Sequence, residues 1–328
     1  MSNRRSFLLA ATTGCIALMA GTGSYAQDPA ADYPNRPVHI VVPFGAGTTT
    51  DQVARFIAQR LTEETKQTFI VDNKPGANGA IALRYAISQP ADGYTFVLGT
   101  NTTHAANLSL FKTLNYDPVK DFIPICNLII GGVILGVAAD GPIKSVPDLI
   151  DRARKNPGKI TFGSGNSSSL AGGVVMRELT GIDIVNVPYK TLPAAMTDLI
   201  GGQIDTVFGD APAVMPSVRS GKVRALGIST KERVPAFPEI PTFIEQGVAG
   251  YEVTGWIAAF GLRGTPPAIV NKLNAMMAKA IASKDATNIF GANGWVSIPG
   301  SPEALGTFQR EEIQRWAKLV KAAGIEPE

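Results

Sequence analysis

The sequence predicts an α/β fold in which mainly parallel sheets are covered by helices. Short runs of β-branched residues alternate along the chain with segments whose apolar residues recur at helical spacing. The length of 328 residues suits about two domains. Hydrophobic residues make up 45% of the chain, which is enough for a packed core.

The first predicted elements lie within residues 38–98. Val38–Val42 is a β-branched run that ends at Pro43 and predicts a buried strand. A helix is expected from Asp51 onward, because apolar residues recur there at helical spacing. These residues are Val53, Phe56, Ile57 and Leu61. Two more strands and one helix are predicted here, at Phe69–Val71, Thr95–Leu98 and Ile81–Ile87.

The same alternation continues to the C-terminal end. Strands are predicted at Val133–Val137, Ile160–Phe162, Ile184–Val187, Thr206–Phe208, Ala225–Ile228 and Val253–Phe260. Helices are predicted between them at Val146–Lys155, Leu170–Leu179, Ala194–Ile200 and Ala213–Ser220. Two long helices close the chain, one opened by Pro266-Pro267 and running to about Ser283, the other from Pro302 to Ala323.

Residues 1–26 have the pattern of a secretory signal peptide. Arg4 and Arg5 precede an apolar run from Phe7 to Ala20, and small residues end at Ala26, where we expect cleavage. The apolar run is shorter than the ~20 residues that a membrane span needs. Asn3–Leu8 also resembles a twin-arginine signal, so the general secretory route and the twin-arginine route both remain open.

The charge of the mature chain is nearly balanced. The full chain has 30 Lys and Arg against 27 Asp and Glu, so removing Arg4 and Arg5 leaves 28 basic residues against 27 acidic ones. A dedicated nucleic-acid or membrane-surface binder would carry a basic patch or stripe. The composition therefore disfavours both of these classes.

Residues that bind metals or form disulfides are scarce. The chain has two Cys and two His. Cys15 is expected to leave with the signal peptide, unless Gly14-Cys15 is a lipoprotein site, and Cys126 lies in an apolar run typical of a core residue. His39 and His104 alone cannot supply a His-rich metal site. The sequence thus predicts no metal, no cofactor and no internal disulfide.

Three loops rich in Gly and hydroxyl residues each follow a predicted strand and precede a predicted helix. They are residues 43–51 (PFGAGTTTD), 99–104 (GTNTTH) and 163–169 (GSGNSSS). In open α/β sheets, ligands bind beyond the carboxyl ends of strands, where helix N-termini favour anions. One such loop is explained by turn and capping requirements alone. Three together predict a site for a small anionic ligand.

Two enzyme patterns match only in part. The sequence GAGTTT at residues 45–50 resembles a dinucleotide fingerprint with Asp72 about 20 residues on, but a threonine replaces the third glycine. For hydrolysis by a Ser–His–acid triad, His104 is available, but Ser164 and Ser168 lie in no G-x-S-x-G elbow. An exported NAD(P)-dependent oxidoreductase that uses the loop at residues 45–50 remains as the enzyme alternative.

A series of motifs in fixed order resembles one receptor family. They are Tyr33–Pro37, Val41–Phe44 with the loop ending at Asp51, Asp72–Ala77, Asp92–Thr95, Tyr116–Phe122, Val187–Lys190, Asp198–Gln203, Gly221–Leu226 and Pro238–Thr242. From Tyr33 to Ile325 the chain resembles the periplasmic solute-binding receptors of tripartite tricarboxylate transporters, also called the Bug family.

The resemblance implies a two-lobed receptor of the Venus-flytrap type, each lobe a mainly parallel sheet flanked by helices. Two strands, near Ile125–Val137 and Tyr251–Phe260, are expected to cross between the lobes. The first lobe would be residues 27–127 plus 252–328, and the second lobe residues 128–251. The resemblance also implies a monomeric, non-catalytic periplasmic protein that captures a small carboxylate and delivers it to membrane permease subunits.

The resemblance places the ligand between the lobes. The first-lobe candidates for contact are Phe44, Gly47, Thr48, Thr49, Asp51, Asn101 and His104. The second-lobe candidates are Ser164, Asn166, Ser168, Tyr189 and Asp210. Asp51 and His104 are also suited to capping a helix, and Tyr189 to core packing. Asp210 would repel an acid, so it is expected to accept from an ammonium, a hydroxyl or a bridging water.

Two departures from the family pattern fall in these loops. Thr48 or Thr49 stands where the family usually has Gly, and Gly209-Asp210 stands where an Asp-Asn-like pair is common. The ligand therefore stays open among tricarboxylates, short dicarboxylates, aromatic acids, acidic amino acids and nicotinate-like molecules. A receptor that reports to a signalling partner instead of a permease also remains open.

Overall fold

The computed structural model describes residues 30–322 and 325–327, so the predicted signal peptide lies outside the described residues. The first lobe contains β1 (Val38–Val42), α1 (Thr49–Thr65), β2 (Phe69–Asn73), η1 (Ala77–Gly79), α2 (Ala80–Ile87), β3 (Thr95–Thr100), η2 (Thr102–Ala106) and α3 (Asn107–Leu110). It also contains α8 (Pro267–Ile281), α9 (Lys284–Gly291), β10 (Trp295–Ser297) and α10 (Pro302–Ala322).

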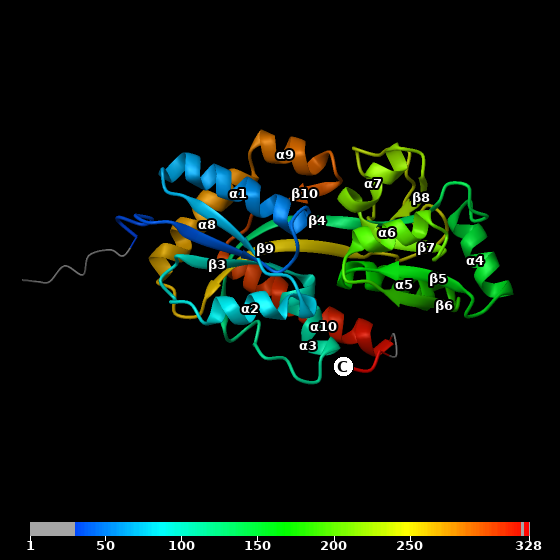
Figure 1. Ribbon diagram of the computed structural model, residues 1–328, viewed down its shortest axis with the longest axis horizontal. Coiled ribbons are helices and arrows are strands. Elements are labelled where there is room, and N and C mark those ends of the chain that lie inside the picture. Colours follow the sequence, from blue (N-terminus) through cyan, green and yellow to red (C-terminus); the bar gives the residue numbers. More distant parts are fainter. Residues whose placement is uncertain (1–29, 323–324, 328) are drawn as a thin grey trace, which may run out of the picture.

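The second lobe lies between two long strands in the chain. Its elements are α4 (Val146–Lys155), β5 (Ile160–Ser164), α5 (Ser167–Thr180), β6 (Ile184–Pro188), α6 (Leu192–Ile200), β7 (Thr206–Asp210), α7 (Ala211–Arg219) and β8 (Val223–Ile228). The two long strands are β4 (Phe122–Ala138) and β9 (Thr254–Leu262). Figure 1 shows both of them running from one lobe into the other, which confirms the two predicted crossing strands.

The strands form one mixed sheet in the order β2-β1-β3-β9-β4-β7-β5-β6, and β8 and β10 also pair with β4. Inside the lobes the pairing is parallel: β1 pairs with β2 and β3, and β5 pairs with β6 and β7. Among the described residues, every antiparallel pair includes β4 or β9. The predicted parallel arrangement therefore holds within each lobe, and the crossing strands make the sheet mixed.

Strand β4 changes its partners where it passes between the lobes. Residues 122–132 pair with β9, and residues 133–138 pair with β7 and β8. At the change, Gly131 pairs with Gly255, and the indole ring of Trp295 lies directly on Gly131. A Cβ atom at Gly131 would come within 2.8 Å of that ring, so the close approach of β10 depends on the glycine.

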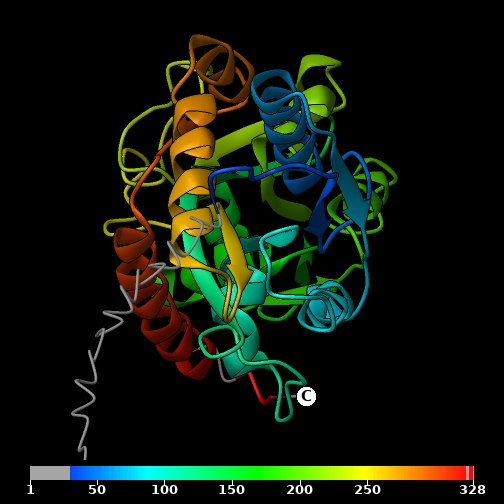
Figure 2. The same ribbon diagram turned by 90° about the vertical axis from the view of Figure 1, so that its left-hand side faces the viewer.

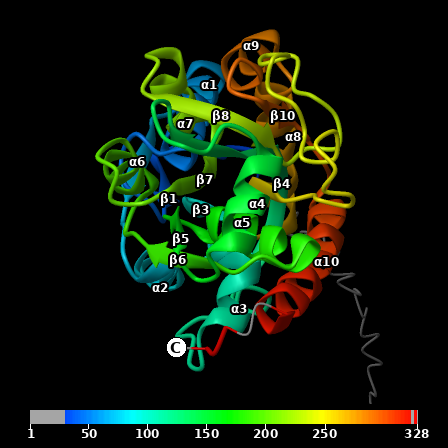
Figure 3. The ribbon, with the colours of Figure 1, turned by 90° about the vertical axis from the view of Figure 1, so that its right-hand side faces the viewer.

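Helices cover both faces of the sheet. In the first lobe, α1, α8 and α9 lie on one side and α2 and α10 on the other (Figures 1 and 2). In the second lobe, α6 and α7 lie on one face of the strands and α4 and α5 on the other (Figure 3). Helix α10 also packs against α5, and one hydrophobic cluster includes Trp316 of α10 and Met176 of α5. This shared core ties the lobes together along one face.

Several elements were not predicted. A π-helical turn, η2, begins almost directly after β3 and leads into α3, where the sequence predicted a loop at residues 99–104. Helix α9 and the short strand β10 were also missed. Within the part of the chain that the structure describes, no helix is both long and apolar enough to span a bilayer.

Candidate ligand-binding site

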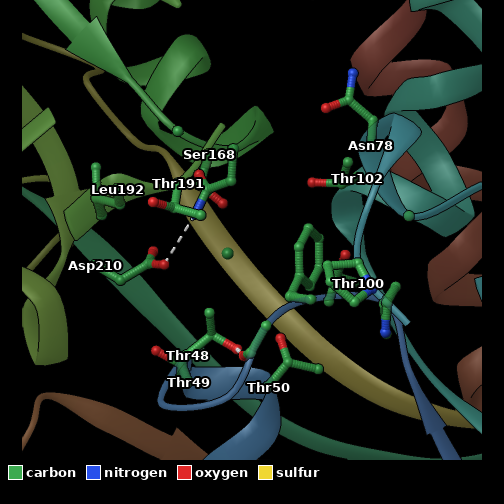
Figure 4. A pocket seen from close by; sticks show the side chains of 18 of the residues that line it. Thr48, Thr49, Thr50, Asn78, Thr100, Thr102, Ser168, Thr191, Leu192 and Asp210 are labelled. Carbon is green, nitrogen blue, oxygen red and sulfur yellow. Dashed lines mark hydrogen bonds between the residues drawn. The ribbon is translucent and has the colours of Figure 1, made fainter. Parts of the chain in front are cut away.

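A cavity of about 1050 Å³ lies between the two lobes, beyond the carboxyl ends of β1, β3, β5, β6 and β7. In Figure 4 the side chains of Thr48, Thr49 and Thr50 lie below this space. Ser168 and Asp210 lie on the second-lobe side, and Asn78, Thr100 and Thr102 lie on the opposite side. Open α/β sheets bind ligands in this position. Nine of the twelve predicted contact residues line the cavity: Phe44, Gly47, Thr48, Thr49, Asn101, Asn166, Ser168, Tyr189 and Asp210.

The first loop leads from β1 into the N-terminus of α1. Thr48 is the N-cap residue of α1, and its hydroxyl donates to the carbonyl of Gly45 (2.8 Å) and accepts from the N–H of Asp51 (3.4 Å). Gly47 has a φ of 82°, a conformation that favours glycine. Thr49 and Thr50 follow in the first helical turn and line the cavity. The loop therefore presents hydroxyls and the N-terminal end of a helix.

Asp51 lies beneath this loop and does not line the cavity. Its Oδ2 accepts hydrogen bonds from the Gly47 N–H (2.9 Å) and from Arg55 Nε (3.0 Å). Burial alone would raise the pKa of Asp51, but the hydrogen bonds from Arg55, Gly47 and Asn73 outweigh it and hold the pKa below its usual value. The prediction of ligand contact is corrected for Asp51, because its carboxylate is engaged in ordering the loop.

The second predicted loop is split between the cavity and the core. Thr100, Asn101 and Thr102 line the cavity. Asn101 is only 4% exposed, and its Nδ2 has no hydrogen-bond acceptor among the described residues. An unpaired buried donor costs about 1–3 kcal/mol, so a ligand acceptor at this position would satisfy a group that the fold leaves open. Asn101 is therefore a strong candidate for ligand contact.

His104 is a core residue and not a lining residue. The π-helical turn carries its ring inward, where it is fully buried and stacks on Phe260. Its Nδ1 lies 2.9 Å from Thr103 Oγ1, and burial lowers the pKa of the imidazole to about 3. The predicted contact with the ligand is corrected here, because the polar sequence around His104 gave no sign of this burial.

The third predicted loop caps α5. The Asn166 side chain accepts from the Ser169 N–H (2.9 Å), and Ser169 Oγ accepts from the Asn166 N–H (3.1 Å), which forms a capping box. Ser168 lies between them in the chain and lines the cavity. Ser164 does not line it, because its hydroxyl donates to Asn186 Oδ1 (2.7 Å) on the neighbouring strand β6. Its predicted ligand contact is therefore corrected as well.

Asp210 ends β7 and lines the cavity from the second lobe. Its Oδ2 accepts from Asn166 Nδ2 at 3.1 Å, the bond drawn in Figure 4. Burial raises the pKa of Asp210 to about 6, and the hydrogen bond from Asn166 only partly opposes this effect. Among the described lining residues, the charged side chains are Asp210 and the exposed Lys190.

Tyr189 and the loop after it form a further wall. Tyr189 lines the cavity, and its hydroxyl donates to Asp198 Oδ2 (2.7 Å). Thr191 is the N-cap residue of α6 and Leu192 follows it. The backbone of these two residues packs on Gly165, where a Cβ atom would lie 2.3 Å from the Leu192 nitrogen. Gly165 thus lets the loops before α5 and α6 meet.

Several lining residues were not named as ligand contacts from the sequence. Six of them lie in the three predicted loops: Pro43, Gly45, Thr50, Thr100, Thr102 and Gly165. The others lie outside these loops: the segment Pro75–Gly79, Phe111, Pro188, Lys190–Pro193, Pro212, Ala213, Gly255–Ile257 and Trp295. The Thr191–Pro193 segment carries a local signal, because a Thr followed by Pro in the first turn marks a helix start. Trp256 and Trp295 reach the cavity only through the pairing of β9 and β10 with β4.

Four helix N-termini converge on the cavity, those of α1, α5, α6 and α7. The first backbone N–H groups of a helix lack intrahelical acceptors, and the helix dipole adds a partial positive charge there. Such ends bind carboxylates and phosphates without a basic side chain. The arrangement is therefore suited to an anionic ligand in a cavity of low net charge.

A two-lobed α/β fold with a ligand-sized cavity between its lobes is typical of solute-binding receptors. The model of the tripartite tricarboxylate transporter family receptor, TctC, matches residues 53–325. The chain belongs to this family. Protein BugT of Bordetella pertussis is 33% identical over 317 residues, which cover 94% of this chain and 96% of BugT. A protein from the gbd 5′ region of Cupriavidus necator is 36% identical over 329 residues, which cover 98% of this chain and 98% of that protein.

Solved structures of similar proteins agree with the fold. The structure of R. palustris Rpa4515 with adipate has a TM-score of 0.87 and 37% identity, and the match covers 90% of this chain and 100% of Rpa4515. The periplasmic binding protein BugD has a TM-score of 0.82 and 31% identity, with 90% and 100% coverage. MatC from Rhodopseudomonas palustris with bound malate has a TM-score of 0.80 and 32% identity, with 88% and 100% coverage.

Proposed function

We propose that this chain is a monomeric, non-catalytic periplasmic receptor that captures a small carboxylate between its lobes and delivers it to a membrane permease. The observation that carries the proposal is the convergence of four helix N-termini on one cavity between the lobes. The adipate and malate bound to two relatives support a carboxylate as the ligand class. Membership of a transporter receptor family supports the role in uptake.

The lining groups can hold an acid without a basic clamp. A hydrogen bond to a charged group contributes about 1.5–3 kcal/mol, and micromolar binding needs about 8 kcal/mol. Asn101 and Thr49 from the first lobe, Ser168 from the second, and the free N–H groups of the helix starts supply enough donors for one or two carboxylates. A few well-placed bonds therefore suffice after the costs of association are met.

Closure of the lobes over the ligand follows from this arrangement. We place the first lobe at residues 27–127 plus 252–328 and the second at residues 128–251, so that the crossing strands β4 and β9 form the hinge region. The N–H of Ser167 on α5 donates to Thr102 Oγ1 on η2 at 3.4 Å, a contact between the lobes beside the cavity. A ligand that touches both lobes would add to this contact and favour the closed form.

A thermal-shift screen of organic acids tests the proposal. A ligand that binds only the folded protein raises its stability by RT ln(1 + [L]/Kd), so the best acid should raise the melting temperature in a concentration-dependent way. The Asn101→Leu variant serves as the matched control, because it removes one lining donor while keeping the side-chain size. Calorimetry then gives the dissociation constant and stoichiometry.

Three outcomes would contradict parts of the proposal. If NAD raises the melting temperature and no carboxylate does, the oxidoreductase alternative at residues 45–50 replaces the receptor. If carboxylates bind but the receptor captures a sensor domain and no permease subunit in a pull-down from its host membranes, the transport role fails. Turnover of a bound acid, followed by mass spectrometry, would overturn the non-catalytic role.

A further inference from the structure

The carboxyl group of Asp210 is turned into the cavity and not toward its own helix. Asp210 is the N-cap residue of α7, yet its side chain makes no capping hydrogen bond to that helix. Its Oδ2 has Asn166 Nδ2 as a partner, and its Oδ1 accepts no hydrogen bond from any described residue. One acceptor oxygen of Asp210 is therefore open toward the ligand space, as its position in Figure 4 also indicates.

The partner of Asp210 is held in one orientation. Asn166 Oδ1 accepts the N–H of Ser169 at 2.9 Å, so the amide cannot turn its oxygen toward Asp210 without breaking the cap of α5. Its Nδ2 is therefore fixed as the group that donates to Asp210. No basic side chain of the described residues pairs with Asp210, and the one basic residue among the described lining residues, Lys190, is exposed.

The first-lobe wall has no carboxylate among its described lining residues. The Asn101 amide donor and the N-terminus of α1 lie in the first lobe and favour a carboxylate. A second carboxylate placed against Asp210 would meet a like charge in a partly desolvated site, which is unfavourable. A ligand with an acid facing the first lobe and a hydrogen-bond donor facing Asp210 therefore satisfies the groups on both sides.

We propose that Asp210 makes the cavity selective for carboxylates that also carry a hydroxyl or an ammonium group on the side facing α7. This inference rests on the proposed function, and it narrows the ligand class within it. A hydroxyl or an ammonium donates to the open Oδ1, whereas an unsubstituted diacid leaves that oxygen without a donor. The raised pKa of Asp210, caused by burial, agrees with a carboxylate that has Asn166 but no basic side chain as a partner among the described residues.

The test uses matched acids that differ only in the donor. Succinate, malate and aspartate form one series, and adipate with 2-aminoadipate forms a longer one, so that chain length and donor are varied separately. Calorimetry at about pH 8 keeps Asp210 ionised, because its pKa is about 6. In at least one series, the native protein should bind a donor-bearing acid about tenfold or more tightly than the unsubstituted acid.

The Asp210→Asn variant distinguishes the two donors. Asparagine still accepts from a hydroxyl, so malate should lose only a few-fold in affinity, whereas aspartate should lose about tenfold or more because its ammonium loses a charge partner. The unsubstituted acids should gain affinity, because the repulsion is removed. Asp183→Asn is the matched control, because Asp183 is exposed and lies away from the cavity, so the same charge change there should leave all affinities unchanged.

The possible results distinguish failure of the inference about Asp210 from failure of the proposed function. If no carboxylate of either series binds the native protein, the proposed function fails. If unsubstituted acids bind as tightly as donor-bearing ones in both series, the inference fails and the carboxylate receptor stands. The inference is also overturned if Asp210→Asn changes the affinities of all the acids by the same factor. It is overturned as well if Asp183→Asn changes the affinities in the way that Asp210→Asn does.

Discussion

The imidazole ring of His104 stacks on the phenyl ring of Phe260, with their centroids 3.9 Å apart and their planes inclined by 17°. Gly99 makes room for this contact, because a Cβ atom there would lie 2.4 Å from His104 Nδ1. The stack joins η2 to β9 inside the first lobe and leaves the imidazole without access to solvent. His104 therefore supports the wall that carries Asn101 without touching the cavity.

We expect His104 to make the protein sensitive to mild acid. Burial lowers its pKa in the folded protein to about 3, against 6.5 for an ordinary His. Between these values the unfolded chain binds a proton that the folded protein does not, so the free energy of unfolding falls as the pH falls through this range. The slope from this group approaches about 1.4 kcal/mol per pH unit.

The His104→Gln variant should lose this part of the pH dependence. Urea unfolding at neutral pH and at about pH 5 gives the fall in unfolding free energy for each protein. This fall should be smaller for His104→Gln than for the native protein. His39→Gln is the control, because His39 is only half-buried on β1 and pairs with Asp72 at 2.7 Å. If His104→Gln and the native protein show parallel pH profiles, the buried neutral His is not what sensitises the fold.

Local sequence patterns predicted the elements of this fold well. β1 and α4 were predicted with their observed bounds, because a β-branched run and a capped amphipathic segment both carry their signals locally. The same local signals failed at His104, where a run of Asn, Thr and His predicted a loop whose histidine contacts the ligand or caps a helix. The structure winds that run into a π-helical turn whose burial depends on Phe260, about 150 residues away in the chain.

The candidate site was predictable mainly in the loops that lead from a strand to the next helix. Thr49, Asn166 and Ser168 lie in such loops or at the helix starts after them, so their place at the sheet edge follows from the α/β pattern. Trp295 lines the same cavity because β10 pairs with β4 beside Gly131, a relationship between distant segments that no local pattern encodes. Ser164 has the same kind of sequence signal as Ser168, but it belongs to β5 and faces Asn186 instead.

Thr48→Val should reduce stability. The hydroxyl of Thr48 caps α1 by accepting from the Asp51 N–H and also donates to the Gly45 carbonyl. Loss of an N-cap side chain typically costs about 1 kcal/mol of folding free energy. Thermal or urea unfolding measures the loss, and Thr48→Ser is the control that retains the cap. A native-like stability of Thr48→Val would mean that the cap does not contribute.

In contrast to Thr48→Val, Thr49→Val should lower the affinity for the ligand and leave stability nearly unchanged. Thr49 lines the cavity one residue into the helix, and its side chain makes no hydrogen bond to a described residue. Its loss should leave stability within about 0.5 kcal/mol, as for most substitutions away from core packing. The affinity for the best acid should fall about tenfold if the hydroxyl donates to a charged ligand group. Thr49→Ser should bind like the native protein, and unchanged affinity of Thr49→Val would remove Thr49 from the site.

The Asn101→Leu variant should separate binding from folding. The buried Nδ2 of Asn101 has no protein acceptor, so an apolar side chain of similar size relieves an unsatisfied donor. We expect a stability equal to or above that of the native protein without ligand, and a clear loss of carboxylate affinity. Melting curves with and without the acid measure both effects. Reduced stability together with native affinity would mean that Asn101 is structural.

Asp210→Asn should stabilise the ligand-free protein at neutral pH. Burial raises the pKa of Asp210 to about 6 in the folded protein, against an ordinary value of 3.8. Between these values the folded protein binds a proton that the unfolded chain does not, so this group lowers stability as the pH rises through that range. At pH 7 the ionised carboxylate therefore costs about 3 kcal/mol, an effect that asparagine lacks.

The pH dependence of this gain identifies its cause. The difference in unfolding free energy between Asp210→Asn and the native protein should be largest above about pH 6 and should shrink toward pH 4, where Asp210 is protonated. Taking the difference removes the contributions of carboxylates such as Asp51, which both proteins share. If the gain in unfolding free energy is equal above pH 6 and near pH 4, new hydrogen bonds of the amide are its cause. A gain confined to neutral pH would show that the fold keeps a carboxylate without a basic partner in its cavity at a cost to stability, as expected if the ligand supplies a donor to its open oxygen.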